Sequence, residues 1–174
     1  GCRFLGTDVV EWVKRGLIDA LTAGPFLTSD YFMPLDEMRA AIDEPTMPIY
    51  ASIEFQHATQ YQNAESVRAL CTSLYDSGAD GISMFNFPTN GRHYHQEVYS
   101  SACEGIEKPE TACKKPLLFS VAHWRVRKDM DLPGILPVTL ETGQSVEIDL
   151  RLPAAAFPAW RSRLVFYVTQ RSRV

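Results

Sequence analysis

The chain has 174 residues, of which 45% are hydrophobic and 22% are charged, and its formal net charge is -4. This composition is ordinary for a soluble globular protein, and the length suffices for one domain or for a domain and a fragment. The acidic balance gives no general attraction to nucleic acid or to an anionic membrane. No apolar run approaches the roughly 18 residues that span a bilayer. We therefore expect neither a nucleic-acid partner nor a membrane partner.

The first predicted unit is a short helix followed by a strand. Thr7 or Asp8 can accept a hydrogen bond from the first turn of a helix over residues 8–15, and Gly16 is suited to end that helix. The apolar stretch over 17–23 then predicts a buried strand.

Two further helix–strand units follow at intervals of about thirty residues, the length of one strand-plus-helix repeat. The second has a helix opened by Pro34 and a strand over 49–55. The third has a helix capped by Asn63 and ended by Gly78, and a strand over 82–87. The helix residues expected to face inward are Leu35, Met38 and Ile42 in the second unit and Val67, Leu70, Cys71 and Leu74 in the third.

These strands are nearly continuous in apolar residues, which favours a parallel sheet with helices on one face and a closed core on the other. Three such units cannot close a barrel, because two sheet edges would stay open. The alternatives are a small open sheet and the last units of an eight-stranded (β/α)8 TIM barrel. We expect the barrel, with its earlier strands preceding Gly1 in a longer protein.

The pattern changes after about Lys115, where helical periodicity gives way to strand-forming residues. We expect residues 1–108 to form the barrel part and residues 116–174 to form an accessory, incomplete, antiparallel β-sandwich-like domain. The polar, proline-bearing stretch over 106–115 is expected to link them. The expected strands lie at 116–127, on either side of a turn at 142–144, and at 164–168.

Polar residues gather after each predicted strand, and parallel βα units bring strand ends to one rim. Carboxylates, amides and aromatic rings together suit a sugar, whose hydroxyls need donors and acceptors and whose ring face needs an aromatic platform. Glu54 ends the second strand and is the candidate catalytic residue for glycoside cleavage, which normally needs a second carboxylate. Alternatively, Glu54 only binds substrate hydroxyls or an arginine. The residues expected to bind substrate are Asp30, Tyr31, Gln56 and Asn86.

The cysteines lack the spacing of a zinc site. Cys71 is expected to be a buried free thiol, and Cys103 and Cys113 could form a disulfide in an oxidising compartment. His93 and His95 alternate, but a metal would need a third ligand and no strong spacing supports one. We expect no metal and no other cofactor.

Three segments, VEWVKRGLID at 10–19, MPIYASIE at 47–54 and GADGISMFNF at 78–87, resemble the last three βα units of a glycoside-hydrolase TIM barrel. The family that the chain resembles over about residues 5–105 is the family-10-like glycosyl hydrolase group of bacterial proteins. The resemblance implies a barrel that acts on carbohydrate, with an accessory β-domain behind it. It places Glu54 where the retaining superfamily has its nucleophile, after the seventh strand. The acid/base partner of that superfamily ends the fourth strand, so the chain alone is expected to be inactive.

The function expected is therefore a carbohydrate-active hydrolase that cleaves glycosidic bonds. The alternative is a non-catalytic carbohydrate-binding or structural protein on the same scaffold. A barrel enzyme for a phosphate ligand is disfavoured, because residues 54–57 and 87–90 lack the glycine-rich backbone that cradles phosphate after the last two strands. The sequence does not indicate an oligomeric state.

Overall fold

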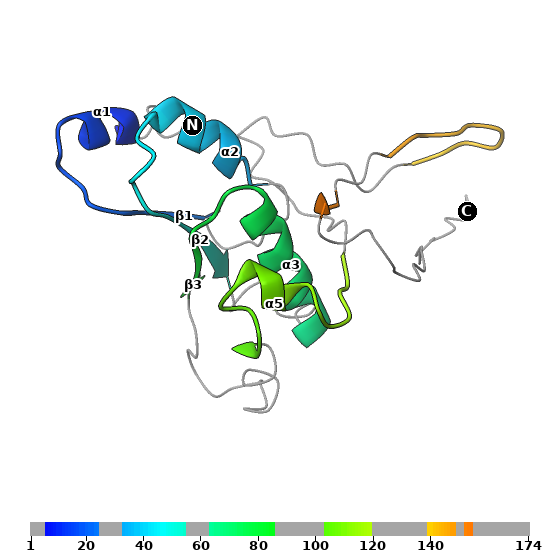
Figure 1. Ribbon diagram of the computed structural model, residues 1–174. Coiled ribbons are helices and arrows are strands. Elements are labelled where there is room, and N and C mark those ends of the chain that lie inside the picture. Colours follow the sequence, from blue (N-terminus) through cyan, green and yellow to red (C-terminus); the bar gives the residue numbers. More distant parts are fainter. Residues whose placement is uncertain are drawn as a thin grey trace.

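The computed structural model describes residues 6–24, 33–54, 63–85, 103–119, 139–148 and 152–154. Within these ranges the chain is a mixed α/β fold whose parallel sheet has three strands in the order β1-β2-β3 (Figure 1). The strands alternate with helices along the chain, as predicted. The elements are α1 (Val9–Lys14), β1 (Leu21–Ala23), α2 (Leu35–Ile42), β2 (Ile49–Glu54), α3 (Ala64–Asp76), β3 (Gly81–Phe85) and α5 (Pro109–Ala112).

The first turns of the helices begin at the residues that the sequence predicts. The Asp8 carboxylate accepts a hydrogen bond from the Glu11 amide at 3.2 Å and caps α1. The Asn63 side chain accepts one from the Ser66 amide at 2.8 Å and caps α3. Pro34 directly precedes α2. These caps satisfy amides that have no partner inside the helix.

Glycines end α1 and α3 in the same way. The amides of Gly16 and Leu17 donate to carbonyls in the last turns of α1, at 2.9 Å each, and Gly16 has a φ of 63°. This is the Schellman motif, and Gly78 closes α3 with the same pair of bonds. Leu17 thus belongs to the helix cap and is 59% exposed. The prediction that a strand begins at residue 17 was wrong, since β1 begins at Leu21.

The side chains of β2 alternate between two faces of the sheet. Ile49, Ala51 and Ile53 are fully buried on one face, where α2 and α3 contribute the facing side chains. The other face carries Tyr50, Ser52 and Glu54 by strand alternation. In the parallel register these three residues pair with Gly81, Ser83 and Phe85 of β3.

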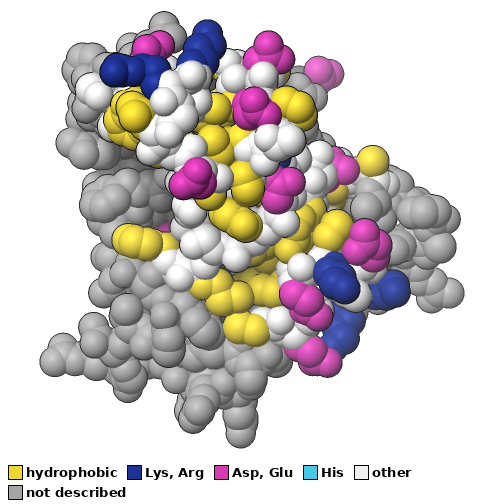
Figure 2. Space-filling model, turned by 60° about the vertical axis from the view of Figure 1, so that its left-hand side comes forward, with side chains coloured by type: hydrophobic (Ala, Val, Ile, Leu, Met, Phe, Trp, Pro, Cys, Tyr) yellow, Lys and Arg dark blue, Asp and Glu magenta, His cyan; other side chains and the backbone are white. Residues whose placement is uncertain are grey.

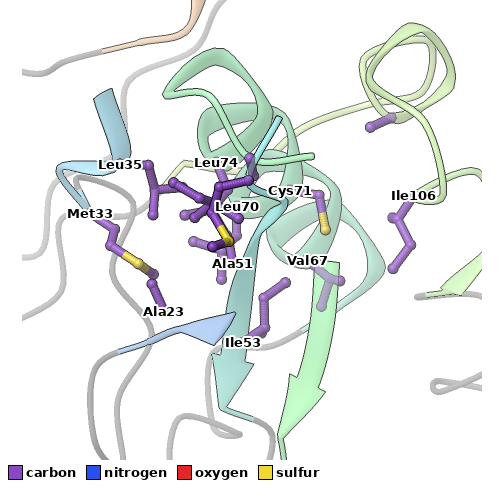
Figure 3. Close-up of a cluster of buried hydrophobic side chains, with 14 of the residues drawn as sticks. Ala23, Met33, Leu35, Ala51, Ile53, Val67, Leu70, Cys71, Leu74 and Ile106 are labelled. Atoms are coloured by element: carbon purple, nitrogen blue, oxygen red, sulfur yellow. The ribbon is translucent and has the colours of Figure 1, made fainter. Parts of the chain in front are cut away.

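The hydrophobic core fills the layer between the sheet and the helices (Figure 3). The inward stripes predicted for the two longer helices are confirmed, with Met38 partly buried and the other residues buried. Figure 2 shows hydrophobic side chains gathered in a band across the described part of one face, with charged side chains on either side of it. The buried residues of the two stripes are Leu35, Ile42, Val67, Leu70, Cys71 and Leu74.

The stretch predicted as a linker also contributes to this core. Ile106 and Ala112 are buried members of the cluster, and α5 packs against α3. The hydroxyl of Tyr75 on α3 donates to the Ile106 carbonyl at 2.9 Å. The sequence did not predict α5, because a helix of four residues is too short to display a period.

The chain beyond α5 returns to the first turns of α3. The Arg68 guanidinium donates to the Pro116 carbonyl, with nitrogen–oxygen distances of 3.2 and 3.3 Å. The amide of Leu118 donates to the Glu65 carbonyl at 3.1 Å. Residues 116–119, where a strand was predicted to begin, therefore dock on a helix and form no strand.

A tight turn forms where the sequence predicts one. The amide of Gln144 donates to the Glu141 carbonyl at 3.0 Å, and Gly143 has a φ of 86°. A positive φ at the third position defines a type II turn. Its twist does not match that of paired strands, and none of the residues 139–148 belongs to a strand. The prediction that strands flank the turn directly was wrong for these residues.

The β-sandwich-like domain over 116–174 stays a prediction, because residues 120–138, 149–151 and 155–174 lie outside those described. One further contact links this region to the end of α3, where the amide of Ala154 donates to the Asp76 carboxylate at 3.3 Å. No helix in the described ranges is both long enough and apolar enough to cross a membrane.

Candidate functional site

The candidate site lies at the edge of the sheet where the three parallel strands end. Ala23, Glu54 and Phe85 are the last residues of β1, β2 and β3. Of the residues predicted to act on a substrate, the structure describes Glu54 alone. The substrate-binding candidates Asp30, Tyr31, Gln56 and Asn86 lie outside the described residues and stay predictions.

Glu54 is a buried carboxylate at the carboxyl end of β2, the middle strand of the sheet. Its residue is 1% exposed, whereas Tyr50, on the same face at the start of β2, is 38% exposed. Burying a carboxylate is costly unless it is hydrogen-bonded or paired. Glu54 is such a buried carboxylate, and it has at least one interaction partner in the fold.

The neighbours of Glu54 on this face are small or aromatic. Phe85 is its register partner on β3 and is 49% exposed. Ser52 lies one pleat earlier on the same strand. A Cβ added at Gly24 would come within 2.6 Å of the Ser52 Cβ, so the chain after β1 approaches β2 closely. Carboxylate, hydroxyl and aromatic groups on one face are the groups that recognise sugars.

A second polar cluster lies at the opposite edge, where the strands begin. The Arg39 guanidinium donates to the Asp80 carboxylate at 2.6 Å, and to the carbonyls of Gly78 at 2.9 Å and Met47 at 3.3 Å. The same Asp80 oxygen accepts the Ile49 amide at 2.7 Å. Because this cluster joins α2 to the starts of β2 and β3, we assign it a structural role.

The Asp80 carboxyl has a perturbed pKa. Burial raises this pKa, but the Ile49 amide and the Arg39 guanidinium both favour the charged form and hold the pKa below its usual value. The sequence did not predict this cluster, because Arg39 and Asp80 are separated by 41 residues and belong to no motif.

The structure shows free thiols at Cys71, Cys103 and Cys113. Cys71 is buried, as predicted. Burial raises the pKa of its thiol, and the electrostatic effect of Cys103 raises this pKa further. No bridge joins Cys103 and Cys113. Each thiol has another neighbour: the Sγ of Cys103 lies 3.8 Å from the Met84 Sδ, and the Sγ of Cys113 lies 3.8 Å from the Glu110 carbonyl.

No group of three or more His, Cys, Asp or Glu side chains among the residues described is arranged to hold a metal ion. His93 and His95 lie outside these residues.

Comparison of the chain with models of known protein families gave no match, and comparison with curated proteins gave none either. The resemblance to family-10-like glycosyl hydrolases therefore rests on the sequence segments alone and stays a hypothesis.

Proposed function

We propose that this chain is the closing part of a (β/α)8 barrel in a carbohydrate-active hydrolase, and that Glu54 is a catalytic carboxylate. One observation carries the proposal. Glu54 ends the middle strand of three parallel strands, at the edge where barrels of this kind hold their active sites.

The architecture of the described part supports the barrel. Successive strands are neighbours in the sheet and their connecting helices pack on one face, which is the arrangement of consecutive barrel units. Tyr50 and Phe85 are partly exposed on the opposite face, which would be the interior of the barrel. The proposal requires five further βα units from outside this sequence. Residues 116–174 would form its accessory β-domain.

Glu54 would act as the nucleophile of a retaining reaction. Its carboxylate oxygen would attack the anomeric carbon and form a covalent glycosyl-enzyme while a second carboxyl group protonates the leaving oxygen. Water, activated by that second group, would then release the sugar. The second group would lie about 5–5.5 Å from Glu54 and must come from another strand of the barrel. The predicted roles of Asp30, Gln56 and Asn86 are hydrogen bonds to sugar hydroxyls, and Tyr31 offers an aromatic platform.

The burial of Glu54 favours a second candidate function. A catalytic carboxylate must touch its substrate, yet Glu54 is 1% exposed. In a non-catalytic carbohydrate-binding or structural protein on the same scaffold, Glu54 would hold the strand ends together and would not enter any reaction.

Replacing Glu54 in the longer protein that carries this chain distinguishes the two. Glu54→Gln should lower kcat on aryl glycosides by several orders of magnitude, because the amide cannot form the covalent glycosyl-enzyme. Glu37→Gln, at an exposed position on α2, should leave kcat unchanged and serves as the matched control. The 174-residue chain alone should show no turnover.

A 2-fluoro sugar with a good leaving group should trap the covalent intermediate, and peptide mass spectrometry should find the sugar on Glu54. Unchanged turnover in Glu54→Gln would remove Glu54 from the chemistry. Sugar binding without hydrolysis in the unmodified protein, together with a lower unfolding midpoint for Glu54→Gln, would support the non-catalytic candidate.

A further inference from the structure

The helix α3 is buried even on the side that faces away from the sheet. A helix that packs on a sheet by one apolar stripe normally leaves its opposite side in solvent. In α3, however, every residue from 66 to 74 is buried, although only four of these residues belong to the core cluster. We call Glu65, Ala69, Thr72 and Asp76 the outward line, because their spacing of four, three and four residues places them along one side of the helix, opposite the inward stripe.

The middle of the outward line is closed to solvent but lies outside the core. Ala69 is fully buried and Thr72 is 3% exposed. Ala69 does not belong to the core cluster between the sheet and the helices, so another part of the chain covers it. Both side chains are small, which allows a covering segment to approach the helix closely.

The chain after α5 contacts both ends of the outward line. At the first turn of α3, the amide of Leu118 donates to the Glu65 carbonyl at 3.1 Å (Figure 1). At the last turn, eleven residues and about three turns further on, the Asp76 carboxylate accepts the Ala154 amide at 3.3 Å. Pro153, next to Ala154, is buried. Because both bonds use backbone amides, α3 binds the main chain of this region.

Asp76 stands where its charge does not favour its own helix. A negative side chain at the carboxyl end of a helix is unfavourable, because the last carbonyl groups carry partial negative charge. No basic residue in the last turn of α3 compensates this charge. The hydrogen bond to Ala154 therefore gives the Asp76 carboxylate a role outside the helix.

We propose that the outward line is a docking surface that fixes the region from Pro116 onward on α3. Domains within one chain move relative to each other by default, and contact at both ends of a three-turn line removes this freedom. Since α3 connects β2 to β3, the predicted accessory domain is thereby attached to the unit that carries Glu54. This inference requires neither a complete barrel nor a catalytic Glu54.

The first test is amide hydrogen exchange of the 174-residue chain with Asp76→Ala. The variant should keep α3, since it removes an unfavourable charge from the helix end. Exchange at Ala154 should accelerate about 2- to 10-fold, the factor that loss of one hydrogen bond gives. Exchange at Leu118, three turns away, should accelerate with it. Asp19→Ala, at an exposed position outside α3, is the matched control and should change neither amide.

The second test places a charge in the middle of the line. The long, charged side chain in Ala69→Lys cannot be buried beneath a covering segment without cost. Exchange at Leu118 and Ala154 should therefore accelerate together, while the amides of β2 stay protected. Ala40→Lys makes the same change at an exposed position of α2 and should leave both amides unchanged.

Acceleration at Ala154 without Leu118 in Asp76→Ala would show two independent contacts and would overturn the docking surface. Unchanged exchange at both amides in either folded variant would overturn it as well. If Ala69→Lys loses the protection of β2 and so fails to fold, Asp76→Ala decides the question.

Discussion

Asp80 and Arg39 form an ion pair of 2.6 Å that joins α2 to the residue before β3. Since the same carboxylate oxygen accepts the Ile49 amide, one side chain fixes the starts of both β2 and β3. This relationship makes part of the stability of the sheet depend on the ionisation of a single carboxyl group.

Stability should therefore fall in acid through Asp80. Its pKa is lower in the folded chain than in the unfolded chain, so its contribution is full above the unfolded value of about 3.9 and is lost as the pH falls through the folded value. Asp80→Asn should destabilise the chain by about 0.5–1 kcal/mol at neutral pH, because the pair is partly exposed. The variant should also show a weaker loss of stability in acid.

Urea unfolding at neutral pH and at about pH 3 measures both effects. Asp19→Asn, at an exposed position, is the control and should keep the acid dependence of the unmodified chain. An identical pH profile in Asp80→Asn would contradict the assignment.

Gly24 should tolerate no side chain. A Cβ at this position would lie 2.6 Å from the Ser52 Cβ, whereas a Cβ at Gly81 would meet the Tyr50 ring at 2.9 Å. The partly exposed ring can turn away, but the Ser52 Cβ moves only with the backbone of β2. Gly24→Ala should therefore cost about 1–3 kcal/mol, and Gly81→Ala should cost less.

Chemical denaturation of the two variants tests this order. Combining Gly24→Ala with Ser52→Gly should recover part of the loss, since the second change removes the obstructing atom. Equal losses for the two alanine variants would show that the approach of β1 to β2 is not the limiting contact.

Tyr75 should hold the segment that precedes α5 on α3 through its hydroxyl. Tyr75→Phe loses the hydrogen bond to the Ile106 carbonyl at 2.9 Å, which should cost about 0.5–1.5 kcal/mol. Burial, followed by the nearby charges of Cys71, Glu107 and Glu110, raises the pKa of Tyr75 to about 12. Because the unfolded chain ionises first, the contribution of Tyr75 should decline as the pH rises from about 10 towards the folded value.

Unfolding at neutral and alkaline pH, with ultraviolet titration of the tyrosines, tests both statements. The Phe variant should lose less stability in alkali than the unmodified chain. A Tyr75→Phe variant of unchanged stability at neutral pH would mean that the hydroxyl does not support the helix contact.

Arg68 should hold the chain after α5 on α3. Its side chain is 6% exposed and donates twice to the Pro116 carbonyl. Arg68→Met keeps the length of the side chain but removes the charged donors, which should cost about 1.5–3 kcal/mol. Amide exchange at Leu118, whose amide donates to the Glu65 carbonyl, should accelerate.

Lys14→Met, at an exposed position of α1, is the matched control and should change neither quantity. If Leu118 exchanged equally fast in the unmodified chain and in Arg68→Met, the guanidinium would not be what holds this segment.

The sequence predicted those parts of the fold that local chemistry determines. Asp8 and Asn63 cap helices because a short polar side chain reaches the amides of the next turn. The bounds of β2 were predicted to within one residue, because the strand is nearly continuous in apolar residues. The coarser result, a parallel α/β sheet, is confirmed, while the barrel stays a proposal.

The errors arose where a helix cap or a distant contact outweighs the apolar pattern. Leu17 is as apolar as a strand residue, but the glycine before it makes it part of a helix cap. Residues 116–119 contain strand formers, yet the buried Arg68 binds the backbone of this segment to a helix. The Arg39–Asp80 pair joins positions that no local motif connects. At the candidate site, alternation places Glu54 on a face but does not predict its burial.

The type II turn at residues 141–144 has a practical consequence. All of residues 139–147 are exposed, and Figure 1 shows this segment running out from the helices and back. Exposed turns of this kind accept added residues with little cost to the packed layers. A fluorophore or an affinity peptide placed at the exposed Thr142, next to Gly143, would report on the chain in solution without entering either the core or the edge that carries Glu54.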